Sequence, residues 1–569
     1  MTSSDRQSLR GTALLADPFL NRGTAFTADE RRALGLEGLL PPQVETLERQ
    51  AERAMAHLDA KPTDLERYIY LSALVDRNET LFYKVLMSDP ARFVPIVYAP
   101  TLGEVCKSFS HLYRRPRGMY ISLDMKGRIA EVLRNWPVPD VRFLCVTTGG
   151  RILGLGDIGA NGMGIPIGKL QLYTACGAVP PHTTLPVQLD IGTTNAALRA
   201  DPLYLGLRRE PPPEAELDAF VEEFVTAVQE VFPACCIHFE DWKGTDAIRY
   251  LERYRDRVLC YNDDIQGTAS VTLAGLVTAL RIKGEQLADQ TFLFLGAGSS
   301  ALGTSDLLVT AMEAEGLTVA EARSRIVMMD VKGLVEPSRT DLSEEQRRYA
   351  HAAAPTRDLL ETIRRVRPSV LIGVSTAGGA FTQPVVELMA EINARPIIFP
   401  LSIPRPECTA EQAYGWSDGR ALYAAGIQFP QVMRGDMVFR PGQANNFYIF
   451  PGLGLAVYAT RPHLITDGLI IEAAHALADQ VSPSAQARGM LYPPQSQILE
   501  VEVTSACRLA EYLFANGMAT VPRPDDIRAW IEGMCYRAET GAGAAGGGGG
   551  GGLSGFCFAV GWLPEISIL

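Results

Sequence analysis

The sequence predicts an α/β protein with a helical N-terminal region, and two patterns along the 569-residue chain support that class. Residues 1–135 contain long amphipathic runs, such as 43–58 and 64–88, with apolar residues at the three- and four-residue spacing of helices. From residue 136 onward, short β-branched and apolar runs alternate with helical stretches. This alternation is typical of parallel sheets whose faces are covered by helices.

The first group of strands predicts a central parallel α/β domain over residues 136–262. The short apolar runs that we expect to form its strands are VRFLCVTT (141–148), TLPVQLDIG (184–192), ACCIHFED (234–241) and RVLCY (257–261). Glycines or polar residues follow these runs, as is common where strands end.

A second group of strands predicts a further α/β domain over residues 263–465. Its strands are expected at TFLFLG (291–296), RIVMMD (325–330), VLIGVS (370–375) and PIIFPLS (396–402). The helices between them would cover both faces of a doubly wound sheet.

The C-terminal part of the chain divides into a helical segment and a low-complexity tail. Residues 466–539 return to helical patterning, and we expect these helices to pack back on the central domain. The last segment, 540–569, begins with TGAGAAGGGGGGG. Such a composition is typical of a flexible linker, so the sequence predicts a disordered tail.

A Gly-rich turn indicates that the second α/β domain is Rossmann-like and binds a dinucleotide. Gly296, Gly298 and Ala301 form a GxGxxA pattern between a predicted strand and a predicted helix, and Ser299 within this turn is a further candidate for cofactor binding. The first Gly permits a tight turn, the second lets the backbone approach a pyrophosphate, and the Ala allows close helix packing. The phosphates would lie at the N-terminus of the helix, where free N–H groups favour anions.

Asp330 ends the next predicted strand and is the candidate ligand of the nucleotide ribose. It lies 34 residues after Gly296, farther than the ~20 residues of the usual pattern. A long crossover helix over 303–323 would account for the extra residues.

Two pairs of acidic residues end predicted strands of the central domain. Glu240 and Asp241 close one strand, and Asp263 and Asp264 follow the next. Active sites of open α/β sheets gather at the carboxyl ends of strands, and Mg²⁺ and Mn²⁺ prefer carboxylate oxygens. The pairs are therefore candidate metal ligands, and the alternative is that they are helix caps or surface charges.

Composition restricts the other function classes. The net charge of −12 argues against nucleic acid as a partner, because phosphate binding needs a basic surface. The ten cysteines include no CxxC pair, as expected of free thiols in a reducing compartment. The N-terminus lacks the pattern of a signal peptide, and no stretch reaches the ~20 apolar residues of a membrane span. We expect a cytoplasmic protein, and an organellar location stays open.

Several long motifs, in one order, resemble those of the malic enzyme family. They are GTALLADPFLNRGTAFTADERRALGLEGLLPP (11–42), VYAPTLGEVCKSFSHLYRRPRG (97–118), RILGLGDIGANGMGIPIGKLQLYTACG (151–177), HFEDW (238–242), NDDIQGTA (262–269) and PGQANNFYIFPGLGLAV (441–457). The resemblance covers roughly residues 11–535. It implies oxidation and decarboxylation of (S)-malate to pyruvate and carbon dioxide with reduction of NADP or NAD, and it implies a homodimer or homotetramer.

The resemblance also implies roles in metal binding and proton transfer. The Mg²⁺ or Mn²⁺ ligands would be Glu240, Asp241 and Asp264, the general base Lys169, its partner carboxylate Asp263, and the general acid Tyr98. The metal would act as a Lewis acid on the C2 oxygen, and the phenol would protonate C3 of enolpyruvate.

Further implied residues hold the substrate and select the cofactor. Arg151 would grip a malate carboxylate through two parallel hydrogen bonds, and Asn445 or Asn446 would help to hold the substrate. The segment DVKGL (330–334) resembles that of NADP-using relatives, with Lys332 as a phosphate partner, although Gln346 stands where such relatives often have Lys. NADP is therefore favoured narrowly over NAD.

The chain also departs from the family pattern, and the departures keep two alternatives open. Ile403 stands where the family usually has an Asn that contacts substrate, and His238 stands for a Gln. One alternative is a catalytically impaired homologue that acts as a binding or regulatory protein. The other is an oxidoreductase for a related hydroxyacid.

Overall fold

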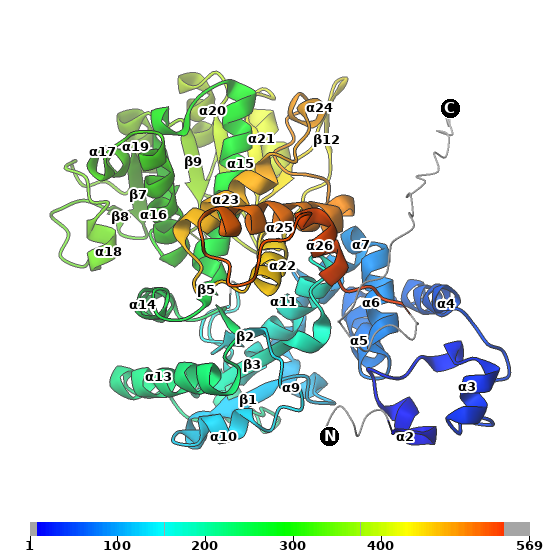
Figure 1. The fold of residues 1–569 in the computed structure, drawn as a ribbon. Coiled ribbons are helices and arrows are strands. Elements are labelled where there is room, and N and C mark those ends of the chain that lie inside the picture. Colours follow the sequence, from blue (N-terminus) through cyan, green and yellow to red (C-terminus); the bar gives the residue numbers. More distant parts are fainter. Residues whose placement is uncertain (1–7, 153, 376, 540–569) are drawn as a thin grey trace.

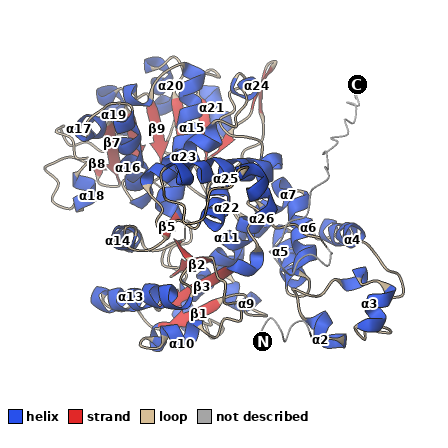
Figure 2. Ribbon diagram, viewed as in Figure 1, coloured by secondary structure: helices blue, strands red, loops and turns tan. Residues whose placement is uncertain are grey.

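The computed structural model describes residues 8–152, 154–375 and 377–539, which form a helical N-terminal lobe and two sheets covered by helices (Figure 1). In this view the C-terminal helices lie between the larger sheet at the top and the smaller sheet at the bottom. Figure 2 shows that helices surround both sheets. The tail predicted over 540–569 lies outside the described residues.

The N-terminal lobe contains mostly short helices. They are α2 (Gly11–Ala16), η1 (Gly23–Ala25), α3 (Ala28–Ala33), α4 (Leu47–Asp59), α5 (Asp64–Val75), α6 (Glu79–Ser88), α7 (Pro90–Val97), α8 (Thr101–Lys107) and α9 (Phe109–Leu112). The run predicted over 64–88 is two helices. The Asn78 side chain accepts a hydrogen bond from the Leu81 N–H and so begins α6 as an N-cap.

The smaller sheet has five parallel strands in the order β1-β3-β2-β4-β5. The strands are β1 (Met119–Ser122), β2 (Phe143–Thr147), β3 (Thr184–Asp190), β4 (Cys236–Phe239) and β5 (Cys260–Asn262). Four of these were predicted. β1 was not, because it lies inside the region that reads as helical and its four residues are too few to show a strand period.

Helices connect and cover this sheet. They are η2 (Leu123–Met125), α10 (Ile129–Leu133), η3 (Gly159–Met163), α11 (Gly164–Ala175), η4 (Pro181–Thr183), α12 (Ala196–Ala200), α13 (Glu214–Val231) and α14 (Gly244–Tyr254). Every residue of α11 is buried, as befits a helix enclosed by other elements on all sides.

The larger sheet has seven strands in the order β14-β11-β10-β9-β6-β7-β8. They are β6 (Phe292–Leu295), β7 (Ile326–Asp330), β8 (Gly333–Leu334), β9 (Val370–Gly373), β10 (Ile397–Pro400), β11 (Leu422–Ala425) and β14 (Gly442–Gln443). All neighbours pair in parallel except β7 and β8. The strand order reverses beside β6, which makes the carboxyl ends of β6 and β9 the crevice where doubly wound sheets bind ligands.

The crossover between β6 and β7 differs from the single helix predicted over 303–323. It contains α16 (Ser299–Ala314) and α17 (Val319–Ser324), and Thr318 starts the second helix with a capping box that involves Glu321. Two helices occupy more residues than one, which explains why Asp330 lies so far from Gly296.

The remaining elements complete this domain and the C-terminal layer. They are η5 (Asp263–Gly267, a π-helical turn), α15 (Thr268–Lys283), η6 (Leu287–Asp289), α18 (Glu344–Arg347), α19 (Leu359–Val366), α20 (Gln383–Ile392), α21 (Ala410–Trp416), the hairpin β12 (Val432–Arg434) and β13 (Met437–Phe439), η7 (Asn446–Tyr448), α22 (Phe450–Thr460), α23 (Asp467–Ala478), α24 (Pro483–Gln486), η8 (Gln495–Gln497), α25 (Ile498–Ala515) and α26 (Ile527–Met534).

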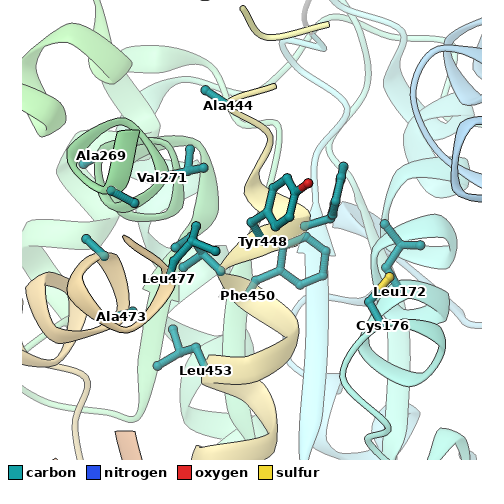
Figure 3. Close-up of a cluster of buried hydrophobic side chains, with 14 of the residues drawn as sticks. Leu172, Cys176, Ala269, Val271, Ala444, Tyr448, Phe450, Leu453, Ala473 and Leu477 are labelled. Carbon is teal, nitrogen blue, oxygen red and sulfur yellow. The ribbon is translucent and has the colours of Figure 1, made fainter. Parts of the chain in front are cut away.

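The main core joins the two sheet-containing parts through α22. Phe450 and Leu453 of this helix lie between α15 and α23 on one side and Leu172 of α11 on the other (Figure 3). α25 packs along α22, and the segment after α26 reaches the smaller domain, where the Tyr536 N–H donates to the Ala178 carbonyl. This continuous apolar contact fixes α11 relative to the larger sheet.

One helical segment in the described residues, Asp263–Lys283, is long and apolar enough to cross a membrane by length and composition alone. Of its most apolar window, 78% is buried inside the protein. It is therefore accounted for as a core helix.

Candidate active site

The acidic pairs meet because β4 and β5 are parallel neighbours in register. Phe239 lies opposite Asn262, so Glu240 and Asp263 follow the two strands side by side. Asn262 caps the turn η5 by accepting a hydrogen bond from the Ile265 N–H. π-helical turns are rare in proteins, and those that occur are often found at functional sites. This one carries Asp263 and Asp264.

Lys169 is the centre of the candidate site. It lies on α11 with 1% of its surface exposed, and its ammonium donates to Asp263 and lies 3.0 Å from Glu240 Oε1. Burial alone would lower the pKa of Lys169, but the adjacent carboxylates of Asp263 and Glu240 raise it well above its ordinary value. The two carboxylates thus favour the protonated amine, and Asp263 is its nearest proton acceptor.

Two aromatic rings cover the Lys169 ammonium. Its Nζ lies 5.2 Å from the ring centroid of Tyr98, which ends α7, and 4.6 Å from that of Phe450, which begins α22. Burial raises the pKa of Tyr98 above its ordinary value, more strongly than the Lys169 charge lowers it. The phenol is therefore neutral at physiological pH and retains a proton that it can donate.

The carboxylates around Lys169 carry more negative charge than this one ammonium balances. Burial, followed by the charge of Asp263, raises the pKa of Glu240 to about 7, although Lys169 opposes this. Burial and Glu240 raise the pKa of Asp264 to about 8, and burial and Asp264 raise that of Asp241 well above its ordinary value. An excess of oxygen donors and negative charge fits a hard divalent cation.

Two further observations support that fit. Asp241 adopts a left-handed backbone conformation with φ +54°, an uncommon state for a non-glycine residue that tends to persist at functional sites. Asp263 Oδ1 is buried and has no hydrogen-bond partner within the described residues. The oxygens of this cluster are therefore incompletely satisfied by the protein alone.

One group of possible ligand atoms, from His238, Glu240 and Asp263, lies within 4.8 Å of one another. Asp263 is bonded to Lys169 and His238 is bonded to Glu240, so both already have protein partners. Asp264 Oδ2 accepts from the Asp241 N–H at 2.7 Å. Glu240, Asp241 and Asp264 remain the predicted metal ligands, and the structure brings them to one end of the sheet.

The two asparagines have different surroundings. The Asn446 amide donates to Asp263 Oδ2 and to the Asp263 carbonyl, both at 2.9 Å, and to Thr268. Asn445 caps η7 by accepting from the Phe447 N–H at 3.2 Å. Asn446 thus orients the partner carboxylate of Lys169, a role that the sequence did not indicate, while a contact of either residue with substrate remains a prediction.

The Gly-rich turn has the geometry predicted for a dinucleotide site. Gly296 has φ +123°, and a Cβ at this position would lie 2.5 Å from the Val374 carbonyl oxygen at the end of β9. Gly298 is the N-cap of α16, which begins at Ser299, and Ala301 is buried in the first turn. The N-terminus of α16 therefore points its free N–H groups at the crevice.

Asp330 ends β7 as predicted, and it forms an ion pair with a residue that the sequence did not indicate. Arg339 grips both Asp330 oxygens, at 2.8 and 2.7 Å, and also contacts Asp341. Lys332 is 60% exposed, and its Nζ lies 3.0 Å from Asp341. A separation of nine residues across a turn gives no periodic signal by which this pair could have been found.

The acidic turn and the nucleotide helix are in direct contact. The Ser300 hydroxyl donates to the Asp264 carbonyl at 3.2 Å, and a Cβ on Gly303 would lie 2.3 Å from Ile265 Cγ2. A Cβ on Gly244 would lie 3.6 Å from Arg151 Nη1 and 3.5 Å from the Ser299 hydroxyl. The predicted substrate residue Arg151 therefore borders the start of α16.

Ile403 lies at the carboxyl end of β10, where its side chain packs on backbone rather than on a polar group. A Cβ on Gly426 would lie 2.9 Å from Ile403 Cγ1, and one on Gly154 would lie 3.5 Å from the Ile403 carbonyl oxygen. The side chain is half-buried. It offers no hydrogen bond to a bound ligand.

The fold and the site together define a two-domain oxidoreductase, in which a dinucleotide crevice opens beside a buried lysine and an acidic cluster. A family model described as "Malic enzyme, N-terminal domain" matches residues 75–255, and one described as "Malic enzyme, NAD binding domain" matches residues 265–514. The chain belongs to the malic enzyme family.

Curated relatives and a solved structure agree with this assignment. The chain is 46% identical to the NADP-dependent malic enzyme of Anas platyrhynchos, over 93% of this chain and 96% of that one. It is 44% identical to the NADP-dependent malic enzyme of Homo sapiens, over 93% and 94%. The crystal structure of the Entamoeba histolytica malic enzyme superposes with a TM-score of 0.55 at 25% identity, covering 78% of this chain and 80% of that one.

Proposed function

We propose that this protein catalyses the oxidative decarboxylation of (S)-malate to pyruvate and carbon dioxide, with NADP as the hydride acceptor and Mg²⁺ or Mn²⁺ as the metal. The observation that carries the proposal is the buried contact of Lys169 with Asp263, Glu240 and the Tyr98 ring, beside the start of the nucleotide helix. This one cluster holds a proton acceptor, a proton donor and ligands for a hard cation.

The residues divide the proton transfers between them. Arg151 binds a carboxylate of the malate dianion through its guanidinium fork. Lys169 takes the C2 hydroxyl proton once its own proton has passed to Asp263, the carboxylate to which it donates. Tyr98, kept neutral by burial, then gives its proton to C3 of enolpyruvate after carbon dioxide has left.

The bound groups would supply the chemistry that these side chains lack. Glu240, Asp241 and Asp264 would hold the divalent cation, whose Lewis acidity stabilises negative charge on the substrate oxygen. A nicotinamide cofactor, held at the Gly296 turn, would supply the acceptor for the hydride of C2. The phenyl ring of Phe450 and the burial of Lys169 keep water away from the amine.

The ion pair of Asp330 with Arg339 supports NADP as the cofactor. A free carboxylate at the end of β7 would suit a ribose hydroxyl and repel a 2′-phosphate. Here Arg339 neutralises Asp330 through two hydrogen bonds, and Lys332 projects from the same turn. The relatives with the same domains are named NADP-dependent.

A cofactor-reduction assay tests the whole proposal. With (S)-malate and Mn²⁺ we expect reduction of NADP, formation of pyruvate and a complete loss of activity in EDTA. The kcat/KM for NADP should exceed that for NAD. No turnover with either cofactor would overturn the proposed activity, and a preference for NAD would overturn the choice of cofactor. Turnover of another 2-hydroxyacid in preference to malate would favour the related-hydroxyacid alternative.

Ile403 favours the second candidate function, that of an impaired homologue with a binding or regulatory role. In that case the parent should show little turnover, and Ile403→Asn should raise kcat/KM for malate at least ten-fold, since one polar contact to substrate contributes ~1–3 kcal/mol. Under the catalytic proposal the same substitution changes kcat/KM by less than that. Steady-state kinetics of the two proteins under identical conditions separate the alternatives.

The assembly and location are also proposals. The described surface exposes Tyr113 to 40%, Leu203 to 59% and Leu205 to 60%, and the Leu205 N–H donates to the Ser110 hydroxyl of α9. Apolar side chains gathered in this way suit contact with a second copy. We infer a homodimer or homotetramer in the cytoplasm, to be checked by light scattering after size exclusion and by fractionation of cells.

A further inference from the structure

A closed network of buried aromatic side chains lies behind the acidic cluster. His238 lies on β4, and its Nε2 is 2.8 Å from Glu240 Oε2. Its Nδ1 lies 3.0 Å from the Tyr173 hydroxyl and 2.9 Å from the Tyr261 hydroxyl, and the two hydroxyls contact each other. Each of the three aromatic side chains is at most 2% exposed.

When Glu240 is ionised, as it would be with a bound cation, the donors and acceptors of this network fit only one arrangement of the histidine proton. An ionised Glu240 only accepts hydrogen bonds, so the ring nitrogen that faces it must carry the proton. A neutral imidazole then has a bare Nδ1, which accepts from one tyrosine hydroxyl while the second hydroxyl donates to the first. Every polar atom of the three rings is thereby satisfied, with the tyrosine pair at one end and the carboxylate at the other.

The network binds one carboxylate oxygen of Glu240, and the other oxygen faces Lys169 in the candidate active site. Glu240 Oε2 is bonded to His238, whereas Oε1 faces Lys169 at 3.0 Å. A carboxylate held in this way cannot rotate about its terminal bond without breaking the bond to the histidine. Groups that hydrogen-bond to metal ligands in this manner orient them and commonly change metal affinity 10- to 100-fold.

We propose that His238 is a positioning residue for the divalent-metal site: its Nε2–H fixes the Glu240 carboxylate, and Tyr173 and Tyr261 fix the histidine tautomer. The inference rests on the proposed function through the metal site. It concerns a position where the sequence resemblance leads us to expect Gln and this chain has His. A Gln side chain offers the same two functions, an N–H for Glu240 and a carbonyl oxygen for the tyrosines.

Mn²⁺ binding to the full-length protein, without malate or cofactor, tests the proposal by electron paramagnetic resonance of the free ion. His238→Leu removes the donor to Glu240, and we expect it to weaken Mn²⁺ binding by ~10- to 100-fold. His238→Gln keeps an amide donor and should bind within ~3-fold of the parent. Tyr423→Phe is the matched control, because it removes a buried hydroxyl that donates to the Cys408 carbonyl in the other domain.

The control separates positioning from general destabilisation. Tyr423→Phe should lower the unfolding temperature without changing Mn²⁺ affinity. At saturating Mn²⁺, His238→Leu should regain most of its kcat while its apparent KM for Mn²⁺ stays raised, a split that simple loss of folded protein would not produce.

A second measurement keeps the proposal falsifiable if His238→Leu does not fold. In ¹⁵N-histidine-labelled parent protein, the signal that disappears in His238→Gln should show a protonated Nε2 and an unprotonated Nδ1. A proton on Nδ1, or on both nitrogens, would overturn the tautomer and with it the positioning role.

The remaining outcomes each decide between the proposals. If the parent binds no Mn²⁺, the metal site and the role of His238 both fail. If His238→Leu binds Mn²⁺ as tightly as the parent, the positioning role fails while the proposed function stands. A His238→Gln protein as weak as His238→Leu would also refute the role, because an amide donor should replace the imidazole.

Discussion

The turn after β6 and the ends of β4 and β5 recognise their ligands by opposite means. At Gly296 and Gly298 the backbone itself approaches the ligand, and side chains are absent so that N–H groups and the start of α16 are accessible. Around Lys169 the recognition elements are long, buried, charged side chains that hold one another in place. The first site should therefore be sensitive to added atoms, and the second to removed charges.

The largest expected effect comes from removing the central charge of the second site. Lys169→Met deletes the proton acceptor, and we expect kcat to fall by roughly 10³-fold, within the 10²–10⁴ that general acid–base catalysis supplies. Steady-state kinetics at saturating malate, NADP and Mn²⁺ would measure it.

Lys283→Met is the matched control for that change, because Lys283 has a 7% exposed side chain paired with Glu285 at 2.7 Å, away from the acidic cluster. Its kcat should equal that of the parent. An equal loss of kcat in the two variants would mean that the activity depends on a buried amine in general, and not on its position beside Asp263.

The first site should respond in two distinct ways to a single methyl group. Gly296→Ala places a Cβ 2.5 Å from the Val374 oxygen at a positive φ, so we expect it to lower the free energy of unfolding by more than ~2 kcal/mol. Gly298→Ala meets no atom within 4 Å, so stability should be unchanged. Its methyl would instead occupy the approach of the pyrophosphate, and KM for NADP should rise roughly 100-fold, or ~2.7 kcal/mol.

Thermal unfolding and NADP kinetics on both alanine variants check this pair. An unchanged KM for NADP in Gly298→Ala would contradict the backbone approach to the ligand. A fully stable Gly296→Ala protein would contradict the tight packing between β6 and β9.

The second site should bind its cation more tightly as the pH rises. The pKa of Glu240 is about 7 and that of Asp264 about 8, so protons occupy both carboxyl groups at low pH and compete with the cation. Below pH 7 the apparent Mn²⁺ affinity should fall about ten-fold or more for each pH unit, and it should level off above pH 8. Paramagnetic resonance titrations between pH 6 and 9 measure this. A flat profile would show that the carboxylates are already ionised without the cation.

The smallest expected effect concerns a buried carboxyl group outside both sites. Glu502 of α25 accepts from the Gly452 N–H at 2.6 Å, its Oε1 has no partner in the described residues, and burial raises its pKa well above the ordinary value. Because the pKa of Glu502 is higher in the folded than in the unfolded state, its contribution to the free energy of unfolding is fully present below the unfolded-state pKa. That contribution is lost as the pH rises through the folded-state pKa. Glu502→Gln should thus stabilise the fold by ~1 kcal/mol at pH 8 and by less at pH 5.

Chemical unfolding at the two pH values would test this difference, with the exposed Glu500→Gln on the same helix as the control. An equal gain for both variants would point to surface charge, and a loss for Glu502→Gln at pH 8 would show that the carboxylate is ionised and stabilising.

The two sites also differ in how far the sequence alone could define them. Four strands of each sheet and the turn at Gly296 were predicted correctly, because strand patterning and the GxGxxA spacing are local properties of the chain. β1, β8, β11 and β14 were missed, and each is only two to four residues long. The family resemblance, and not residue spacing, suggested that Lys169 and Asp263 act together.

What escaped prediction are contacts between distant segments. Asn446 binds Asp263 across 183 residues, and His238 binds Tyr173 across 65. Neither pair has a periodic signature, since only the packing of separate elements in the folded chain brings them together. Arg339 was missed for a related reason, since the sequence of a turn does not indicate which carboxylate an arginine in it will pair with.

The close packing of Gly303 against Ile265 couples the nucleotide helix to the acidic turn. With no side chain between them, helix α16 rests on the turn that carries Asp263 and Asp264, so a tilt of one would displace the other. Binding of a dinucleotide at the N-terminus of α16 would then change the affinity of the acidic turn for its cation. By thermodynamic linkage, each ligand would change the affinity for the other by the same factor.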